Sequence, residues 1–122
     1  MKEELENKLY KAYPKIFPQK GMGIACGSGW YALLDALCVS IQGYTDGRKN
    51  IGKEVAQVEA VQVKEKFGGL RFYYHGGDKC IEGMVWLAEA MAPRICEWCG
   101  TTVGVKTSGK RWLRSLCEKC AK

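Results

Sequence analysis

The segment Val63–Gly77, VKEKFGGLRFYYHGG, predicts a β-hairpin and with it the sheet of the fold. Apolar and polar residues alternate on both sides of the pair Gly68-Gly69, and glycine readily accepts the positive φ angles of a two-residue turn. With the turn at these glycines, one face of the hairpin is largely apolar, and we expect it to be buried. Its apolar members are Val61, Val63, Phe67, Leu70, Phe72 and Tyr74.

The opposite face of this hairpin carries three cations and an aromatic residue: Lys64, Lys66, Arg71 and Tyr73. Such a face could neutralise the phosphates of a nucleotide and stack on its base. It could equally be a solvated surface, and the pattern leaves both interpretations open. The glycines themselves need no phosphate, because the turn geometry explains them.

Apolar residues recur at helical spacing in three other segments. The first helix is expected at residues 2–13. The second is expected at about 29–42, with Ser28 as its N-cap and Gly43 at its end. The third is expected at about 79–91 and is stopped by a proline. These helices provide the apolar faces that can cover the hairpin.

The remaining segments complete an α+β fold. We expect a glycine-rich loop at 21–29, polar turns at 44–52 and a long strand with a bulge at 54–67. The predicted fold is a small antiparallel sheet, built on the hairpin, that packs on two to three helices and is followed by a C-terminal zinc ribbon or knuckle hairpin. We divide the chain into a core domain, 1–93, and a zinc-binding module, 94–122.

Four of the seven cysteines form the strongest motif of the chain. Cys96 and Cys99 make one C-x2-C pair and Cys117 and Cys120 make another, at a separation typical of structural zinc sites. One Zn²⁺ held by four thiolates has no open position for water, so we expect it to stabilise structure and not to catalyse hydrolysis. Iron remains an alternative, because four-cysteine sites also accept it.

The module between the two cysteine pairs is predicted to be a hairpin, with strands at Val103–Thr107 and Arg111–Ser115. Trp112 is expected to pack against the metal site. The module is basic, since residues 94–122 hold seven Lys and Arg against two Glu. Plain solubilising charge is one interpretation, and the other is contact with nucleic acid. The residues for such contact are Lys106, Lys110, Arg111 and Arg114, with Trp112 or Trp98 stacking on bases.

The sequence gives little support for catalysis. His75 is the only histidine, and no carboxylate pair has a spacing that fixes a shared site. The string Gly47–Lys53 resembles a P-loop, but Glu54 stands where a Ser or Thr would bind Mg²⁺. We therefore expect a binding protein and not an enzyme.

Length and composition favour one modest core with at most one small appended module. The chain has 122 residues, and none of its apolar runs approaches the roughly 20 residues that cross a bilayer. The charged N-terminal segment, MKEELENKLYKAYPKIF, lacks the apolar region of a signal peptide. We expect a cytoplasmic protein without membrane contact.

Three strings of the chain, GSGWYALLDALC, VKEKFGGLRFYY and CEWCG with a later CEKC, resemble a family of small, largely uncharacterised phage and prophage proteins. The resemblance spans roughly Cys26 to Cys120. It implies a phage accessory protein in the cytoplasm of a host cell, where such proteins commonly bind defence components, their nucleotide signals or nucleic acid. It implies no catalytic residues.

Three functions therefore remain. The first is capture of a phosphate-bearing small molecule, which could sequester a nucleotide signal or inhibit a host defence factor. Its candidate residues are Lys64, Lys66, Arg71, Tyr73, Trp30 and Ser28. The second is nucleic-acid binding through the basic module. The third is an adaptor for a host protein, and a homo-oligomer is possible in each case.

Overall fold

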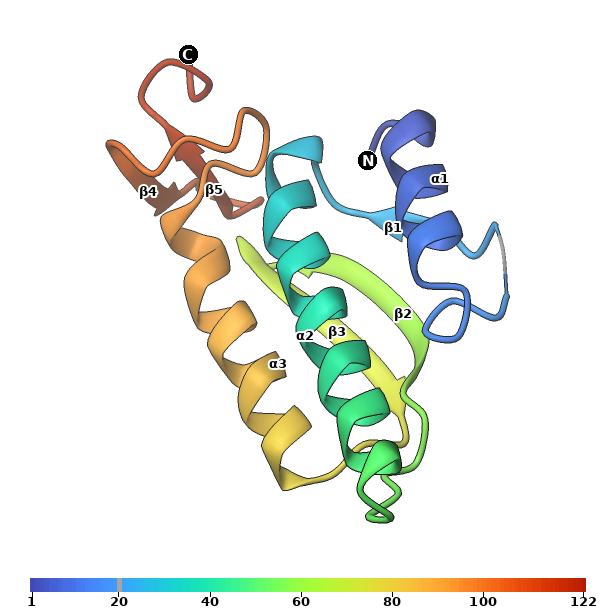
Figure 1. Ribbon diagram of the computed structural model, residues 1–122. Coiled ribbons are helices and arrows are strands. Elements are labelled where there is room, and N and C mark those ends of the chain that lie inside the picture. Colours follow the sequence, from blue (N-terminus) through green and yellow to red (C-terminus); the bar gives the residue numbers. More distant parts are fainter. Residues whose placement is uncertain (20) are drawn as a thin grey trace.

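The computed structural model describes residues 1–19 and 21–122 and confirms the α+β fold (Figure 1). The helices are α1 (Glu3–Ala12), α2 (Tyr31–Asn50) and α3 (Lys79–Met91), with short 3-10 turns at Ser28–Trp30 and Ala92–Arg94. The strands are β1 (Ile24–Ala25), β2 (Glu59–Lys66), β3 (Gly69–His75), β4 (Val105–Ser108) and β5 (Arg114–Cys117). None of the helices in the described ranges combines the length and the apolar character needed to cross a bilayer.

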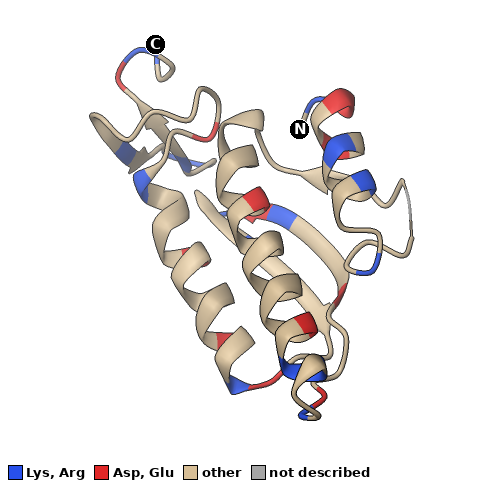
Figure 2. Cartoon of the chain, in the orientation of Figure 1, with Lys and Arg blue, Asp and Glu red and all other residues tan. Residues whose placement is uncertain are grey.

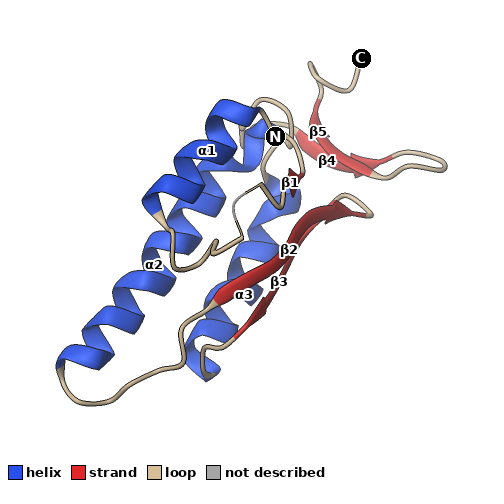
Figure 3. Cartoon of the chain, turned by 90° about the vertical axis from the view of Figure 1, so that its right-hand side faces the viewer, coloured by secondary structure: helices blue, strands red, loops and turns tan. Residues whose placement is uncertain are grey.

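The main sheet has the strand order β1-β2-β3 and is mixed. β2 and β3 form the predicted antiparallel hairpin, whereas β1, a strand not predicted, pairs in parallel with β2 through Ile24 and Val63. The helices lie on one side of this sheet (Figure 3). Large side chains fill the space between the layers and are almost fully buried, among them Trp30, Phe17, Leu34, Leu70 and Ile81. This packing fixes which face of the hairpin points to solvent.

The hairpin turn lies one residue earlier than predicted. Phe67 and Gly68, with φ angles of 54° and 81°, form the turn, and Lys66 pairs with Gly69. Gly68 is held there because its N–H donates to the Glu65 carboxylate (2.8 Å) and its carbonyl accepts from the Ser115 hydroxyl (2.6 Å). The pairing thus slips by two residues, which leaves the side chains from Gln62 to Lys66 on their predicted faces.

Two apolar residues of the hairpin are nevertheless exposed, contrary to the prediction. Phe67 is 68% exposed because it is part of the turn, and Val61 is 51% exposed because it is the extra residue of a bulge between Ala60 and Gln62. The predicted bulge is therefore present, although the strand is Glu59–Lys66 and not 54–67. The bulge moves Ala60 to the buried face, while Val61 turns outward.

Helix α2 is longer than predicted and begins differently. It continues through Gly43 to Asn50. The prediction of turns at 44–52 is therefore wrong for residues 44–50, which are helical. Burial outweighs the low helix propensity of glycine here, since Thr45 is buried and donates its hydroxyl proton to the Ile41 carbonyl (2.8 Å). Ser28 does not cap the helix, because its hydroxyl accepts from the Lys2 N–H (3.1 Å).

Helix α3 has the predicted bounds. Asp78 caps its first turn by accepting from the Ile81 N–H (3.1 Å), and its other carboxylate oxygen accepts from the Tyr44 hydroxyl (2.6 Å). These bonds join the start of α3 to α2. The two helices therefore lie side by side over the hairpin (Figure 1).

The C-terminal module contacts the core at several points. The predicted boundary between residues 93 and 94 falls in the 3-10 turn Ala92–Arg94, and hydrogen bonds cross it. The Gly29 N–H donates to the Glu97 carbonyl (2.7 Å), and the Trp30 indole N–H donates to the Ile95 carbonyl (2.9 Å). A β-carbon at Gly29 would overlap the carbonyl oxygen of Cys96. The string GSGW thus needs glycine because the module lies directly against it.

We predict opposite effects for two glycine-to-alanine changes in the α2 region. Gly29→Ala should lower the free energy of unfolding by about 1–3 kcal/mol, because the new methyl group forces the module away. Gly43→Ala is the matched control, since nothing lies within 4 Å of its added β-carbon, and it should raise stability by about 0.5–1 kcal/mol. Urea denaturation measures both changes, and an unchanged stability of Gly29→Ala would contradict the close contact.

Candidate metal centre

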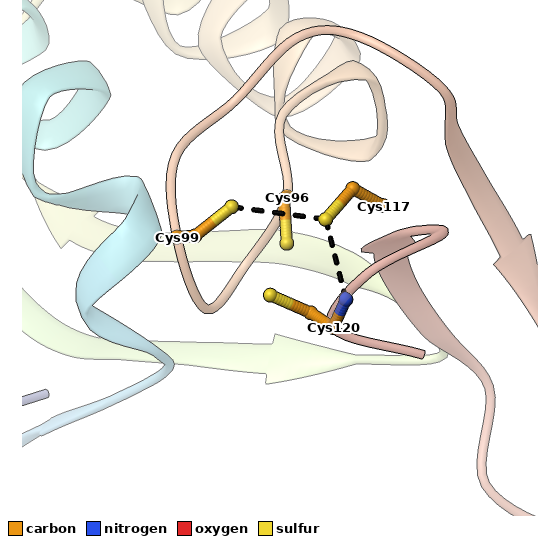
Figure 4. Close-up of side chains that lie close together, drawn as sticks. All are labelled: Cys96, Cys99, Cys117 and Cys120. Atoms are coloured by element: carbon orange, nitrogen blue, oxygen red, sulfur yellow. Dashed lines mark hydrogen bonds between the residues drawn. The ribbon is translucent and has the colours of Figure 1, made fainter. Parts of the chain in front are cut away.

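The structure brings the four predicted cysteines together at the junction of the module's two turns (Figure 4). The sulfur atoms of Cys96, Cys99, Cys117 and Cys120 all lie within 4.8 Å of one another. In a tetrahedron with metal–sulfur bonds of about 2.3 Å, neighbouring sulfurs are about 3.8 Å apart. The separation of the Cys99 and Cys117 sulfurs is 3.8 Å, and all seven cysteines are free thiols. The four-cysteine cluster therefore fits a metal ion.

Two similar turns present these thiols. In the first knuckle, residues 96–100, the Gly100 N–H donates to the Cys96 carbonyl (2.9 Å), and Gly100 adopts a φ of 82°. In the second, residues 117–121, the Ala121 N–H donates to the Cys117 carbonyl (3.0 Å). The Cys120 N–H also donates to the Cys117 sulfur (3.4 Å). These turns bring the four sulfurs to one point.

The thiols of the cluster differ in acidity. Burial opposes ionisation of Cys96, but hydrogen bonds from the backbone at Cys117, Cys99 and Trp98 outweigh it and lower the pKa of this thiol to about 6. Cys120 interacts with the sulfur of Cys117 and is partly desolvated, and its pKa is raised to about 12. A cation bound among these sulfurs would favour their thiolate forms.

Glu97, in the first knuckle, is the functional residue that sequence reasoning missed. Its side chain is fully buried and one of its oxygens accepts from the Gly27 N–H (2.9 Å). Arg114 donates to both carboxylate oxygens (2.9 and 3.0 Å), and this bond raises the pKa of its guanidinium. The Glu97 backbone N–H donates to the Ser115 carbonyl (2.9 Å). Glu97 therefore joins the first knuckle to the core and to β5.

The sequence could not have distinguished Glu97 from Glu118. Both occupy the second position of a C-E-x-C string, yet Glu97 is buried and Glu118 is exposed. The difference arises because only the first knuckle meets the Gly27–Trp30 turn. The burial of Glu97 between two of the predicted metal ligands therefore depends on the packing of the first knuckle on the core, which the local sequence does not show.

The structure brings residues from two separately predicted sites into one cleft. The hairpin–loop cleft, of about 280 Å³, is lined by residues 64–67 of the β2–β3 hairpin, residues 111–113 of the β4–β5 loop and Arg114 at the start of β5. Lys64 and Lys66 come from the predicted ligand face, whereas Arg111, Trp112 and Arg114 come from the predicted nucleic-acid set. The tip of the hairpin lies beside this loop in Figure 3, and Figure 2 shows basic segments on both.

The other predicted site residues lie elsewhere. Arg71 and Tyr73 lie on the outward face of β3, beyond the cleft, and Lys106 lines a different hollow, with Arg94 and Val105. Lys110 is exposed, but it is not a lining residue of the cleft.

Three predicted roles of aromatic and hydroxyl residues need correction. Trp30 is fully buried and bonded to the Ile95 carbonyl, so it cannot bind a ligand. Ser28 borders a separate hollow beside Gly29 and Gly100. Trp112 is 82% exposed and does not pack against the cysteines, because the loop that carries it extends away from them. Trp98 is half-exposed on the first knuckle, outside the cleft.

We predict that Glu97→Gln destabilises the protein by about 1–3 kcal/mol, because it leaves the Arg114 guanidinium without its buried counter-charge. The loss is smaller than for a fully buried ion pair, because the Arg114 side chain is 43% exposed. Glu118→Gln makes the same change at the matching position of the second knuckle and should alter stability by less than about 0.5 kcal/mol. Thermal and urea unfolding of both variants provide the test, and equal effects would contradict the role of Glu97.

Comparison of the chain with protein-family models, with curated proteins and with solved structures finds no match. The proposals that follow therefore depend on the contacts, distances and charges described above.

Proposed function

We propose that this chain is a non-catalytic, zinc-stabilised binding protein that holds a phosphate-bearing ligand in the hairpin–loop cleft. The observation that carries this proposal is the meeting of Lys64 and Lys66 with Arg111 and Trp112, which come from segments more than 40 residues apart in the sequence. Two sets of cations that pattern alone placed on separate surfaces form one concave site.

Zinc is the metal that suits the four-cysteine cluster best. It has no preferred geometry of its own and binds four thiolates tetrahedrally in closed structural sites. Such a site offers no position to a substrate, which supports a structural role. Iron could occupy the same ligands, and the metal content of the purified protein distinguishes the two.

The charges of the cleft favour an anion. Arg114 is neutralised by Glu97 at 2.9 Å and lies 3.8 Å from Glu65. Lys64, Lys66 and Arg111 have no carboxylate within salt-bridge distance in the part of the chain that the structure describes. Even when Glu65 is counted, the lining keeps an excess of positive charge, which a phosphate group would balance.

The rim of the cleft favours a ligand with a flat ring. Phe67 is 68% exposed on the hairpin and Trp112 is 82% exposed on the loop. Burying such rings would be favourable, and aromatic side chains next to cations stack on nucleobases. The Lys66 ammonium already lies 5.6 Å from the Phe67 ring centroid. A nucleotide presents both a phosphate and a base, so capture of a nucleotide signal is one form of this proposal.

We expect one zinc ion per chain and a structural dependence on it. Cys99→Ser should abolish stoichiometric metal binding and lower the melting temperature by several degrees, because the metal bonds contribute to folding. Cys80→Ser, an exposed cysteine outside the cluster, is the control and should keep both. Native mass spectrometry and elemental analysis measure the metal, and a folded wild-type protein without metal, or with iron, would contradict the zinc assignment.

We expect the protein to bind ATP or a twelve-nucleotide oligothymidylate, and we expect the affinity to depend on the cations of the cleft. The double variant Lys66→Ala/Arg111→Ala should weaken binding about tenfold or more, since it removes two cations that face the ligand. Lys106→Ala/Lys110→Ala removes the same charge from outside the cleft and should weaken it less than about threefold.

Calorimetry and fluorescence anisotropy at fixed salt measure these affinities. Failure of the wild-type protein to bind either probe would refute the proposed function. An equal loss in the two double variants would show that only net charge matters and would also contradict it.

A further inference from the structure

We infer that the ligand is a single-stranded nucleic acid, which enters the hairpin–loop cleft and continues along the outer face of the β2–β3 hairpin past Arg71 and Tyr73. This inference rests on the proposed function. It specifies the phosphate-bearing ligand as a single strand of nucleic acid and gives the surface along which the strand lies.

The outer face of the hairpin is an open platform. The helices cover the opposite face, and no element of residues 1–19 and 21–122 is seen over this one (Figure 3). Two cross-strand pairs share the outer face next to the cleft, Lys64 with Arg71 and Gln62 with Tyr73. Tyr73 is 43% exposed, so its ring is available to a ligand. Along this face, starting from the cleft, the cations Lys64 and Arg71 come first and the ring of Tyr73 follows.

The pairing of Lys64 with Arg71 is unfavourable by itself. Like charges directly opposite each other destabilise an antiparallel pair. In the described residues no carboxylate forms a salt bridge with Lys64 or Arg71. Glu65 accepts from the Gly68 N–H, and Glu89, on α3, accepts from the Phe72 N–H (3.0 Å). A phosphate between Lys64 and Arg71 would remove the repulsion.

The platform is continuous with the cleft. Lys64 belongs to both, since it lines the cleft and lies opposite Arg71. From Lys66 to the level of Tyr73, opposite Gln62, the hairpin extends about 13 Å at about 3.3 Å per residue. A mononucleotide has one base and one phosphate group or chain, so it can contact the cations and rings at only one end of this surface. A polynucleotide repeats both the base and the phosphate. It can therefore stack on Trp112 and Phe67 at one end of the surface and on Tyr73 at the other.

The exposed rings favour a single strand over a duplex. Stacking on an aromatic side chain requires an unpaired base, because the bases of a duplex are stacked on one another inside the helix. Tracks of cations interspersed with aromatic rings are typical of proteins that bind single strands without sequence readout. We therefore expect weak dependence on base sequence and strong dependence on salt.

Arg71→Gln and Tyr73→Ala test the path, because both lie outside the cleft that would hold a mononucleotide. Each should weaken binding of a labelled twelve-nucleotide oligothymidylate at least about fivefold and leave ATP binding unchanged. Arg71→Gln should also reduce the slope of log affinity against log salt by about 0.7. The matched controls, Lys106→Ala for the cation and Trp86→Ala for an exposed ring on α3, should change oligonucleotide binding less than about twofold.

The outcomes separate this inference from the proposed function. Oligothymidylate that binds no more tightly than ATP and is indifferent to both Arg71→Gln and Tyr73→Ala overturns the inference, while cleft-dependent ATP binding keeps the proposed function. A duplex of equal length that competes as well as the single strand also overturns the inference. Absence of binding by both probes refutes both. Thermal melting of each variant confirms that the losses do not come from unfolding.

Discussion

The ion pair between Glu97 and Arg114 is the interaction on which the arrangement of this molecule depends. The carboxylate is fully buried and also accepts from the Gly27 N–H, so it joins the start of the α2 region, the first knuckle and β5. A buried charge is tolerated only when it is paired and hydrogen-bonded, and Glu97 meets both conditions. Removing the Glu97 side chain would cost the module its bond from the Gly27 N–H and the partner of Arg114, while the backbone bonds from Gly29 and Trp30 would remain.

The same pair relates the metal centre to the cleft. Arg114 begins β5 and is a lining residue of the cleft, and β5 ends at Cys117, one of the four clustered cysteines. Gly68, at the hairpin tip, receives a hydrogen bond from Ser115 of the same strand. An ion bound in the four-cysteine cluster would therefore stabilise the strand that shapes one wall of the cleft. Such an ion would affect the proposed ligand binding without contacting the ligand.

Sequence reasoning succeeded where a local pattern decides the structure. The faces of most hairpin residues, the presence of a bulge in the strand pattern and the bounds of α3 follow from the periodicity of apolar residues, and the clustering of the four cysteines follows from their spacing. The position of the bulge, and with it the exposure of Val61, was not predicted. Sequence reasoning failed where distant residues decide. Ser115 and Glu65 set the turn at Phe67-Gly68, and buried packing carries α2 through Gly43. The joining of two cation sets into one cleft depends on the docking of the module, which no local pattern encodes.

The contact between Gly27 and Glu97 spans 70 residues and has a consequence for synthesis of the chain. A ribosome releases the GSGW segment early, yet its partner emerges only after all of α2, the hairpin and α3. Contacts of such long sequence separation slow folding, because the entropy of closing a large loop is lost before the contact forms. During synthesis the Gly27–Trp30 segment therefore lacks its contacts with the first knuckle. Folding is completed only after the cysteines of the module have left the ribosome.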